Sequence, residues 1–290
     1  MLYIIGVDQT SSKFFSSNSR NMIKKLVENS FKSIDEGLYN ISNIDFSHDA
    51  LSLKKKILDY KEKSLIPIIT EIKFSSPSKG VIMNRNNNTD LLNISREMIK
   101  GGAAGLSVLT QKYLFNGSIN NFVTIRRHTP IPMLMKDIIV SEIQLDCAKN
   151  IGADYILLIM SIFDKNLAEG DLDKFTEYAH KKGLNILYEV HRENEFKEIL
   201  KYNLKKHDLI GINNRNLDDL QIDLQITEKL LNKFDKGKNV IVSESGINNS
   251  NQIKQLRNAG ADAFLIGTSI MEKNEKNISH KIKELVNIIQ

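Results

Sequence analysis

From about residue 66 onward, short apolar segments alternate along the chain with longer amphipathic segments. The apolar segments are typical of buried strands, and eight are predicted: Ile66–Glu71, Gly105–Leu109, Met133–Lys136, Tyr155–Ile159, Asn185–Val190, Leu209–Asn213, Asn239–Glu244 and Ala263–Gly267. A helical apolar period follows each of them, at about residues 90–100, 118–127, 141–150, 171–182, 193–201, 224–233, 250–258 and 277–289. Each interval between strand ends is long enough for a crossover helix, so the strands are predicted to be parallel.

A short motif recurs where three of these helices end. Gly102-Ala103-Ala104, Gly152-Ala153-Asp154 and Gly260-Ala261-Asp262 each precede an apolar strand. The glycine provides the left-handed conformation that ends a helix, and the small alanine lets the chain turn back under the sheet. Eight repeated strand–helix units favour an α/β fold of the closed (β/α)8 TIM barrel type. The alternative is an open, doubly wound sheet.

The first 65 residues do not follow this alternation. Two helices are expected there, Asn21–Glu36 and Ser52–Ser64, neither of them paired with a strand. We therefore divide the chain into an N-terminal extension, residues 1–65, with one or two capping helices, and a barrel, residues 66–290.

Charged side chains follow directly on the apolar runs of four predicted strands: Glu71, Lys136, Glu189 and Glu244. Lys73 lies two residues beyond the first strand end, and Asn213 and Arg215 repeat that spacing at the sixth strand. Because barrel active sites lie at the C-terminal ends of the strands, we expect a ring of three cations facing three carboxylates. A single charge there could simply mark a strand end, but six at one mouth favour acid–base catalysis. Neighbouring cations are expected to lower the pKa of a lysine in this ring.

A phosphate site is predicted beside this ring. Ser245-Gly246 follows the seventh strand and Gly267-Thr268-Ser269 follows the eighth, where barrels commonly bind phosphate. Both glycines expose backbone N–H groups, and a short helix after either turn would direct its positive end at an anion. Residues 76–80, Ser-Pro-Ser-Lys-Gly, add hydroxyls and a cation to the same rim. The alternative is that both glycines occupy ordinary tight turns.

The composition narrows the function classes. The net charge is +5 with a pI near 9.0, but the lysines are scattered among acids, so we expect a small anionic substrate and no nucleic acid. The single Cys147 excludes an intrachain disulfide, and no apolar run approaches the length of a membrane span. Residues 1–7 lack the features of a secretory signal, so a cytoplasmic protein is expected.

Metal and nucleotide chemistry are not expected either. The six histidines show no ligand spacing, and no glycine-rich dinucleotide or ATP motif occurs, so we predict that the protein uses no cofactor. His191 follows Glu189 closely, but a loop or helix-cap position is expected for it in preference to a place behind the site.

Seven or more short motifs together resemble indole-3-glycerol-phosphate synthase, a family of tryptophan biosynthesis. The segment from Ile68 to Gly80, IITEIKFSSPSKG, is similar to the first-strand signature of that family. The likeness continues in family order over about residues 66–272, through SVLT at 107, FNGS at 115, LMKD at 134, GADYILLI at 152, EVH at 189, GINNR at 211, SESGI at 243 and LIG at 265.

The resemblance implies a reaction and a set of catalytic residues. The reaction is ring closure of 1-(2-carboxyphenylamino)-1-deoxyribulose 5-phosphate, with loss of CO2 and water, to indole-3-glycerol phosphate. Lys136 would be the general acid that protonates the ketone oxygen, and Glu189 the general base of the later steps. Asn213 would hold the substrate hydroxyls, and Lys73, with Glu71 as its partner, would pair with the anthranilate carboxylate.

The resemblance also implies the binding residues. Arg215 and Glu244 would orient the catalytic network. The phosphate would be held by Ser76, Ser245, Gly246, Gly267 and Thr268, and the aromatic ring by Phe115, Leu157 and Ile159. We expect a monomer with a phosphorylated small-molecule substrate, and the resemblance allows association with other enzymes of tryptophan biosynthesis.

Some positions depart from the family pattern. Ile138 replaces a phenylalanine, Thr268 stands where Ser or Glu is commoner, and the segment from Gln111 to Leu114 replaces a more acidic, aromatic lead-in to Phe115.

Two other functions stay open. A phosphoribosylanthranilate isomerase would need a Cys/Asp acid–base pair, and a non-catalytic barrel would bind a phosphorylated ligand without turnover.

Overall fold

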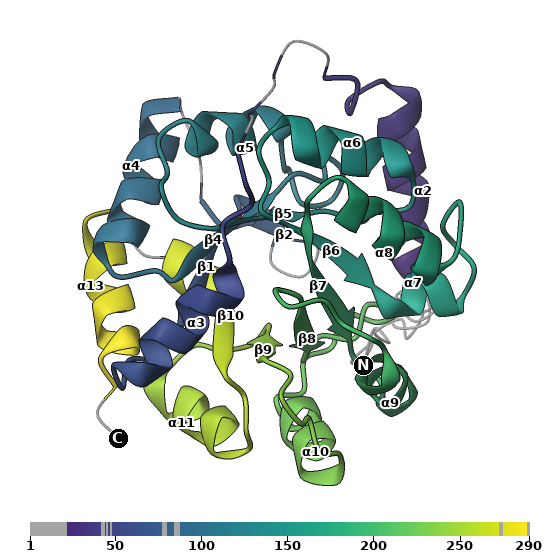
Figure 1. Ribbon diagram of the computed structural model, residues 1–290. Coiled ribbons are helices and arrows are strands. Elements are labelled where there is room, and N and C mark those ends of the chain that lie inside the picture. Colours follow the sequence, from purple (N-terminus) through teal and green to yellow (C-terminus); the bar gives the residue numbers. More distant parts are fainter. Residues whose placement is uncertain are drawn as a thin grey trace, which may run out of the picture.

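Eight parallel strands close into a barrel at the centre of the molecule (Figure 1). The structure, a computed structural model, describes residues 22–41, 44, 46, 48–76, 80–83, 88–272 and 275–288. The strands are β1 (Ile68–Ile72), β4 (Gly105–Leu109), β5 (Met133–Lys136), β6 (Tyr155–Ile159), β7 (Asn185–Val190), β8 (Leu209–Asn213), β9 (Ile241–Glu244) and β10 (Ala263–Ile266). All eight strand predictions are confirmed, and β1 pairs with both β4 and β10, so the open doubly wound alternative is wrong.

Helices surround the barrel and connect successive strands (Figure 1). The eight predicted ones are observed as α4 (Asn88–Lys100), α5 (Ile119–Arg126), α6 (Glu142–Asn150), α8 (Leu172–Lys181), α9 (Glu193–Lys201), α10 (Gln225–Lys233), α11 (Ser250–Asn258) and α13 (Glu275–Val286). Three short elements were not predicted: α7 (Met160–Asp164) and the antiparallel pair β2 (Ser75–Ser76) and β3 (Gly80–Val81); the short helix considered after Gly267 is observed as α12 (Thr268–Met271). They are too short to show a period in the sequence.

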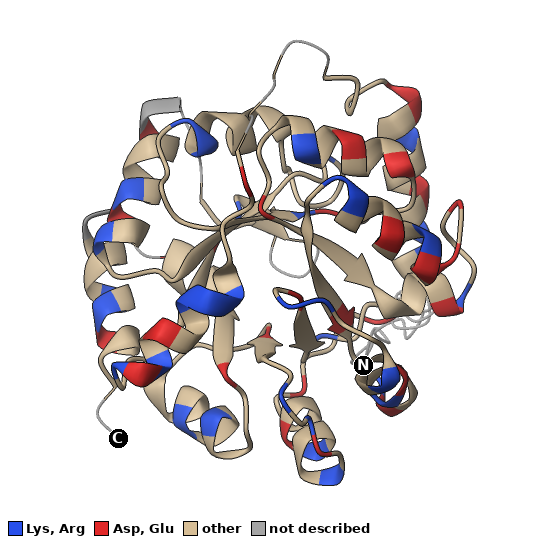
Figure 2. Ribbon diagram, in the orientation of Figure 1, with Lys and Arg blue, Asp and Glu red and all other residues tan. Residues whose placement is uncertain are grey.

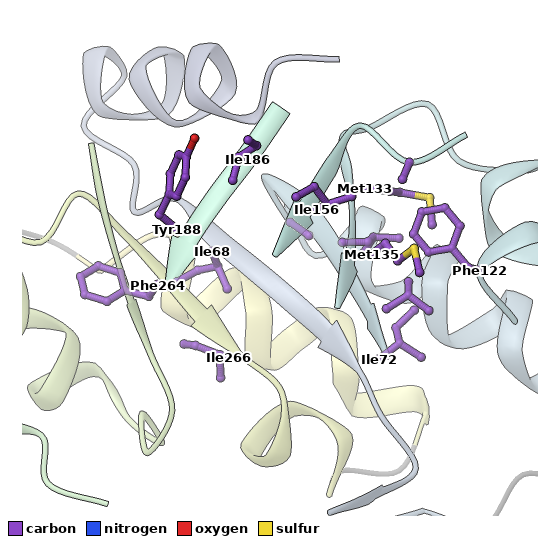
Figure 3. Close-up of a cluster of buried hydrophobic side chains, with 14 of the residues drawn as sticks. Ile68, Ile72, Phe122, Met133, Met135, Ile156, Ile186, Tyr188, Phe264 and Ile266 are labelled. Carbon is purple, nitrogen blue, oxygen red and sulfur yellow. The ribbon is translucent and has the colours of Figure 1, made fainter. Parts of the chain in front are cut away.

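The barrel and its helices share an extensive apolar layer. Figure 3 shows part of it, with Ile68, Met135, Ile156 and Phe264 from four strands and Phe122 from α5. On the outer surface, Lys and Arg are interspersed with Asp and Glu around the helices (Figure 2). Among the described residues, no helix is both long and apolar enough to cross a membrane.

Inside the barrel, inward-pointing side chains form layers of four from alternate strands, as expected for this fold. The strand registers give, from the N-terminal end, Gly105/Tyr155/Leu209/Ala263, then Ile69/Leu134/Leu187/Val242, then Ser107/Leu157/Gly211/Leu265. The next layer consists of Glu71, Lys136, Glu189 and Glu244. Four charged residues from β1, β5, β7 and β9 therefore lie together above three mainly apolar layers.

The two N-terminal helices contact opposite ends of this barrel. In α3 (Leu53–Glu62), Leu53 and Ile57 join the apolar interior, and the backbone N of Lys54 donates to the hydroxyl of Tyr155 in the lowest layer. In α2 (Met22–Asp35), the Ser30 hydroxyl donates to the carbonyl of Ile138, just beyond β5, at 2.8 Å. Of the two predicted capping helices, α2 therefore lies at the mouth and α3 closes the floor.

Three buried aspartates lie near the floor, and two of them, Asp154 and Asp262, end copies of the repeated motif. Each precedes a strand and accepts a hydrogen bond from the start of the strand before it: Asp154 from Met133 N (2.7 Å), Asp208 from Ile186 N (3.1 Å) and Asp262 from Ile241 N (2.8 Å). Asp154 also accepts from the buried guanidinium of Arg126 (2.7 Å) and from the backbone N of Leu51 (2.7 Å). It therefore links β5, β6, α5 and the segment leading into α3.

Replacing Asp154 by alanine is expected to lower the free energy of unfolding by about 3–5 kcal/mol, because it leaves the Arg126 charge buried without its partner. Denaturant unfolding followed by circular dichroism measures this. Glu198→Ala, which removes an exposed carboxylate paired with Lys201, should leave the midpoint unchanged. A loss below about 1 kcal/mol for Asp154→Ala would contradict this view of the floor.

Candidate active site

An open cleft of about 1180 Å³ lies at the C-terminal ends of the barrel strands. The residues of the Lys/Glu ring and the aromatic wall line it, and so do Ser76, Ser245, Gly246, Gly267 and Thr268 of the predicted phosphate site, whereas Ser269 and Gly80 do not. The structure also adds residues that the sequence did not single out: Leu109, Leu217, Leu220 and Ile222 extend the apolar wall. They lie on or after strands, where an apolar side chain in the sequence does not indicate whether it contacts a ligand.

Lys136 is the centre of the charged layer. Its Nζ donates to Glu189 Oε2 at 2.8 Å and to Glu244 Oε2 at 2.6 Å. Burial alone would lower the pKa of Lys136, but the carboxylates of Glu189, Glu244 and Glu71 outweigh it and raise the pKa above its usual range. The expectation of a lysine with a lowered pKa is therefore wrong for Lys136, because its nearest neighbours are anions.

When Lys136, Glu189 and Glu244 are all ionised, their net charge is −1. This surplus negative charge appears at Glu244. Burial raises its pKa to about 7, with Lys136 opposing the shift and Glu189 adding to it. Among the described residues no group hydrogen-bonds to its second carboxylate oxygen, Oε1. That oxygen occupies the space beside Gly211, where a Cβ atom would overlap it. A glycine at this position in β8 therefore makes room for the carboxylate inside the barrel.

A second charged pair lies at the end of β1. Lys73 Nζ is 2.7 Å from Glu71 Oε1. Burial opposes ionisation of Glu71, but Lys73 and Lys136 outweigh it and lower its pKa. Gly267 faces this pair, and a Cβ atom there would lie 2.8 Å from Glu71 Oε1. Burial lowers the pKa of the Arg215 guanidinium, with Glu71 opposing the shift.

Asn213 links Glu189 to the back of the site. Its side-chain Nδ2 donates to Glu189 Oε1 at 3.0 Å, and its Oδ1 accepts from the backbone N of Arg215 at 2.9 Å. His191 lies in the expected loop, just before α9, but its ring also contacts the site. Its Nδ1 lies 2.7 Å from the Asn213 carbonyl oxygen. The Glu-x-His spacing, which places both residues on one side of β7, was the signal for this contact.

The predicted phosphate turns have the expected backbone. Ser245 and Gly246 both have positive φ, +68° and +80°, and α12 begins at Thr268, directly after Gly267. Ser76 lies in β2 and is nearly buried. The predicted contribution of residues 77–79 to this rim lies outside the described residues.

The loop after β4 presents Phe115 to the cleft, and α2 holds this loop. Gln111 Nε2 donates to the Ser30 hydroxyl at 2.9 Å, and Lys112 pairs with Glu36 at 2.9 Å. The Tyr113 hydroxyl donates to the same Glu36 carboxylate. The residues that depart from the family pattern here are thus the ones that bind the N-terminal extension. Ile138 lines the cleft from the segment that follows β5, at the position where the family pattern has a phenylalanine.

The described residues contain no group of three His, Cys, Asp or Glu side chains that could hold a metal ion. Cys147 is buried in α6 and takes no part in the cleft. The Cys/Asp pair that an isomerase of the alternative kind would need is therefore not formed by this cysteine.

Comparisons with known proteins agree with this site. A family model described as indole-3-glycerol phosphate synthase matches residues 20–285. The chain is 45% identical to an indole-3-glycerol phosphate synthase of Methanocaldococcus jannaschii over 81% of this chain and 83% of that protein. It is 39% identical to one from Campylobacter jejuni subsp. doylei over 81% and 85%.

Solved structures show the same fold at low sequence identity. Tryptophan synthase subunit alpha from Legionella pneumophila superposes with a TM-score of 0.55 at 12% identity, covering 82% of this chain and 97% of that one. Thiamine phosphate pyrophosphorylase from Pyrococcus furiosus gives 0.52 at 18% identity, covering 76% and 93%. The family match over most of the length, with relatives at 39–45% identity, establishes that the chain belongs to the indole-3-glycerol phosphate synthase family.

Proposed function

We propose that this chain closes the pyrrole ring of 1-(2-carboxyphenylamino)-1-deoxyribulose 5-phosphate to give indole-3-glycerol phosphate, CO2 and water. The observation that carries the proposal is the ammonium group of Lys136, which is held between Glu189 and Glu244 at the base of the cleft. The reaction is redox-neutral and requires only ordered proton transfers. A ring of Lys and Glu side chains supplies these without a redox co-substrate.

The first step is attack of the carboxylate-bearing ring carbon on the ketone. Lys136 is the general acid, because its raised pKa keeps it protonated at neutral pH. The ketone oxygen becomes an alkoxide as the carbon–carbon bond forms, so it gains basicity as it receives the proton. Lys73 pairs with the substrate carboxylate and fixes the ring against Phe115, Leu157 and Ile159. The carbon–CO2 bond then breaks, and its electrons restore the aromatic ring.

Dehydration completes the indole. The new hydroxyl leaves as water after a second protonation, and the nitrogen lone pair stabilises the cation that forms. Glu189 is the general base that removes the C–H proton to form the pyrrole double bond. Asn213 orients Glu189 through its 3.0 Å hydrogen bond, and Glu71, Glu244 and Arg215 hold the two lysines and the substrate hydroxyls in register.

The phosphate is held across the cleft from this ring. Ser245, Gly246, Gly267 and Thr268 provide backbone N–H groups and hydroxyls, and Ser76 adds a hydroxyl from the first loop. Anchoring the phosphate fixes the ketone near Lys136, because binding energy remote from the reacting atoms positions them.

We propose further that the protein acts as a cytoplasmic monomer, in which residues 1–65 are an extension of a catalytic barrel formed by residues 66–290. The contacts of α2 with the loop after β4 support a role of the extension in shaping the cleft. Gel filtration with light scattering tests the monomer.

Replacing Lys136 by alanine is expected to lower turnover at least ~100-fold, the usual size of a general-acid contribution. Formation of the indole product is followed by its fluorescence, which is clear because the chain contains no Trp. Retained substrate binding with lost turnover supports the acid role, whereas unchanged turnover would refute it. Lys201→Ala, an exposed lysine on α9, serves as the matched control and should have wild-type activity.

Glu244→Gln is expected to lower turnover while raising the free energy of unfolding at alkaline pH. The raised pKa means that the folded protein binds the Glu244 proton more tightly than the unfolded chain, so wild-type stability falls as the pH rises from about 4.5 to about 7. The glutamine variant lacks this loss and should be about 1–2 kcal/mol more stable than wild type at pH 8, with no gain at pH 4.5. Its turnover should fall. Chemical denaturation at the two pH values measures the difference, and a variant less stable than wild type at pH 8 would contradict the assignment of surplus charge.

A further inference from the structure

A second, smaller cavity adjoins the cleft at Glu189. Glu189, Ile159 and Leu217 line both spaces. The wall of the second cavity is buried at Val190 and Glu195, and its rim is half-exposed, formed by His191, Arg192, Asn216, Leu217 and Asp218. The cavity has room for about one water molecule. It therefore lies between the general base and the solvent.

A buried carboxylate oxygen lacks a partner in this cavity. Glu195 is 1% exposed, and its Oε2 accepts from the backbone N of His191 (2.8 Å) and of Arg192 (3.0 Å). No group among the described residues hydrogen-bonds to its other oxygen, Oε1, which lies 3.8 Å from Arg192 Nη1. Burial raises the pKa of Glu195. Buried polar atoms of this kind are commonly satisfied by an ordered water, and Ser161 provides a hydroxyl on the same cavity wall.

His191 connects this cavity to the catalytic residues. Its Nδ1 must carry a hydrogen, because it lies 2.7 Å from a carbonyl oxygen, that of Asn213. Nε2 of the neutral ring is then an acceptor. A histidine held in this way can accept a proton at Nε2 and pass one on.

Ion pairs fix the rim around the histidine. Asp218 accepts from Lys165 Nζ at 2.7 Å and pairs also with the guanidinium of Arg192. The loops that follow β6, β7 and β8 are thereby joined at one carboxylate. Among the described residues that line this cavity with His191, the titratable and charged groups are Glu189, Glu195, Arg192 and Asp218.

The proposed reaction requires a proton from outside the site, and the inference rests on that function. Two protons are consumed, one by the ketone oxygen and one by the departing hydroxyl. One proton is returned when the C–H bond breaks. Carbon dioxide leaves from a carboxylate, taking no proton with it. Each turnover therefore takes up one proton from solvent, while the bound substrate fills the cleft above Lys136.

We infer that the second cavity holds a water molecule that, together with His191, delivers this proton to Glu189. Glu189 then reprotonates Lys136 across their 2.8 Å contact. The site is thus an inlet for protons from solvent, separate from the mouth through which the substrate enters. His191 acts through Glu189 and does not touch the substrate.

The test uses His191→Asn, whose amide can still donate to the Asn213 carbonyl but cannot relay a proton. Stopped-flow fluorescence reports indole formation, and a pH indicator in weakly buffered solution reports proton uptake. In the wild type we expect one proton per indole, in step with product formation. In the variant the first turnover should be normal, whereas later turnovers slow about tenfold and proton uptake lags behind the product. Added imidazole should restore the rate.

A second variant distinguishes loss of the proton path from a folding defect of His191→Asn. Ser161→Val fills the cavity from α7 without touching the Asn213 contact, and the same slowing in weak buffer is expected. His128→Asn, which changes an exposed histidine of the loop after α5, should match the wild type.

Wild-type rates for both cavity variants in weak buffer would refute the proposal that protons enter through the second cavity. A first turnover of His191→Asn slowed as much as later ones, without rescue by imidazole, would overturn it as well and leave His191 only the positioning of Asn213. A wild-type protein that forms no indole would instead refute the proposed function, and the inlet with it.

Discussion

The ammonium group of Lys136, held between two carboxylates, sets the main physical constraint on this molecule. A charge inside a barrel is tolerated only with partners at hydrogen-bond distance, and here Glu189 and Glu244 lie at 2.8 and 2.6 Å. Two carboxylates against one ammonium leave a surplus negative charge, which appears as the raised pKa of Glu244. Gly211 is small because Glu244 occupies the space beside it.

The rest of the barrel supports this layer from below. Three apolar layers fill the interior, α3 closes its floor, and buried aspartates such as Asp154 join neighbouring strands at their N-terminal ends. Buried ion pairs and hydrogen bonds lie at the floor, and the candidate active site lies at the opposite end, where α2 contacts the loop that carries Phe115. This separation lets the mouth hold destabilising charges that the floor offsets.

Much of this arrangement was predictable because it follows from periodicity. Strand ends such as Glu71 and Lys136 mark an abrupt change from apolar to charged, and parallel strands bring such ends to one mouth. The pKa of Lys136 was not predictable, because its direction depends on whether carboxylates or lysines lie nearest in space. The position of α3 at the floor and the His191–Asn213 contact were not predictable for the same reason, because they depend on which distant residues lie close together in space. The catalytic role of each residue in the ring stays a prediction.

The most direct test of the central claim is to add 1-(2-carboxyphenylamino)-1-deoxyribulose 5-phosphate to the wild-type protein in the presence of a chelator. The chain has no Trp, so the indole product is seen against an almost dark background. We expect a rise in indole fluorescence that needs neither metal nor nucleotide. Binding of the substrate with no rise would contradict it, and the Lys/Glu ring would then be a binding site without turnover.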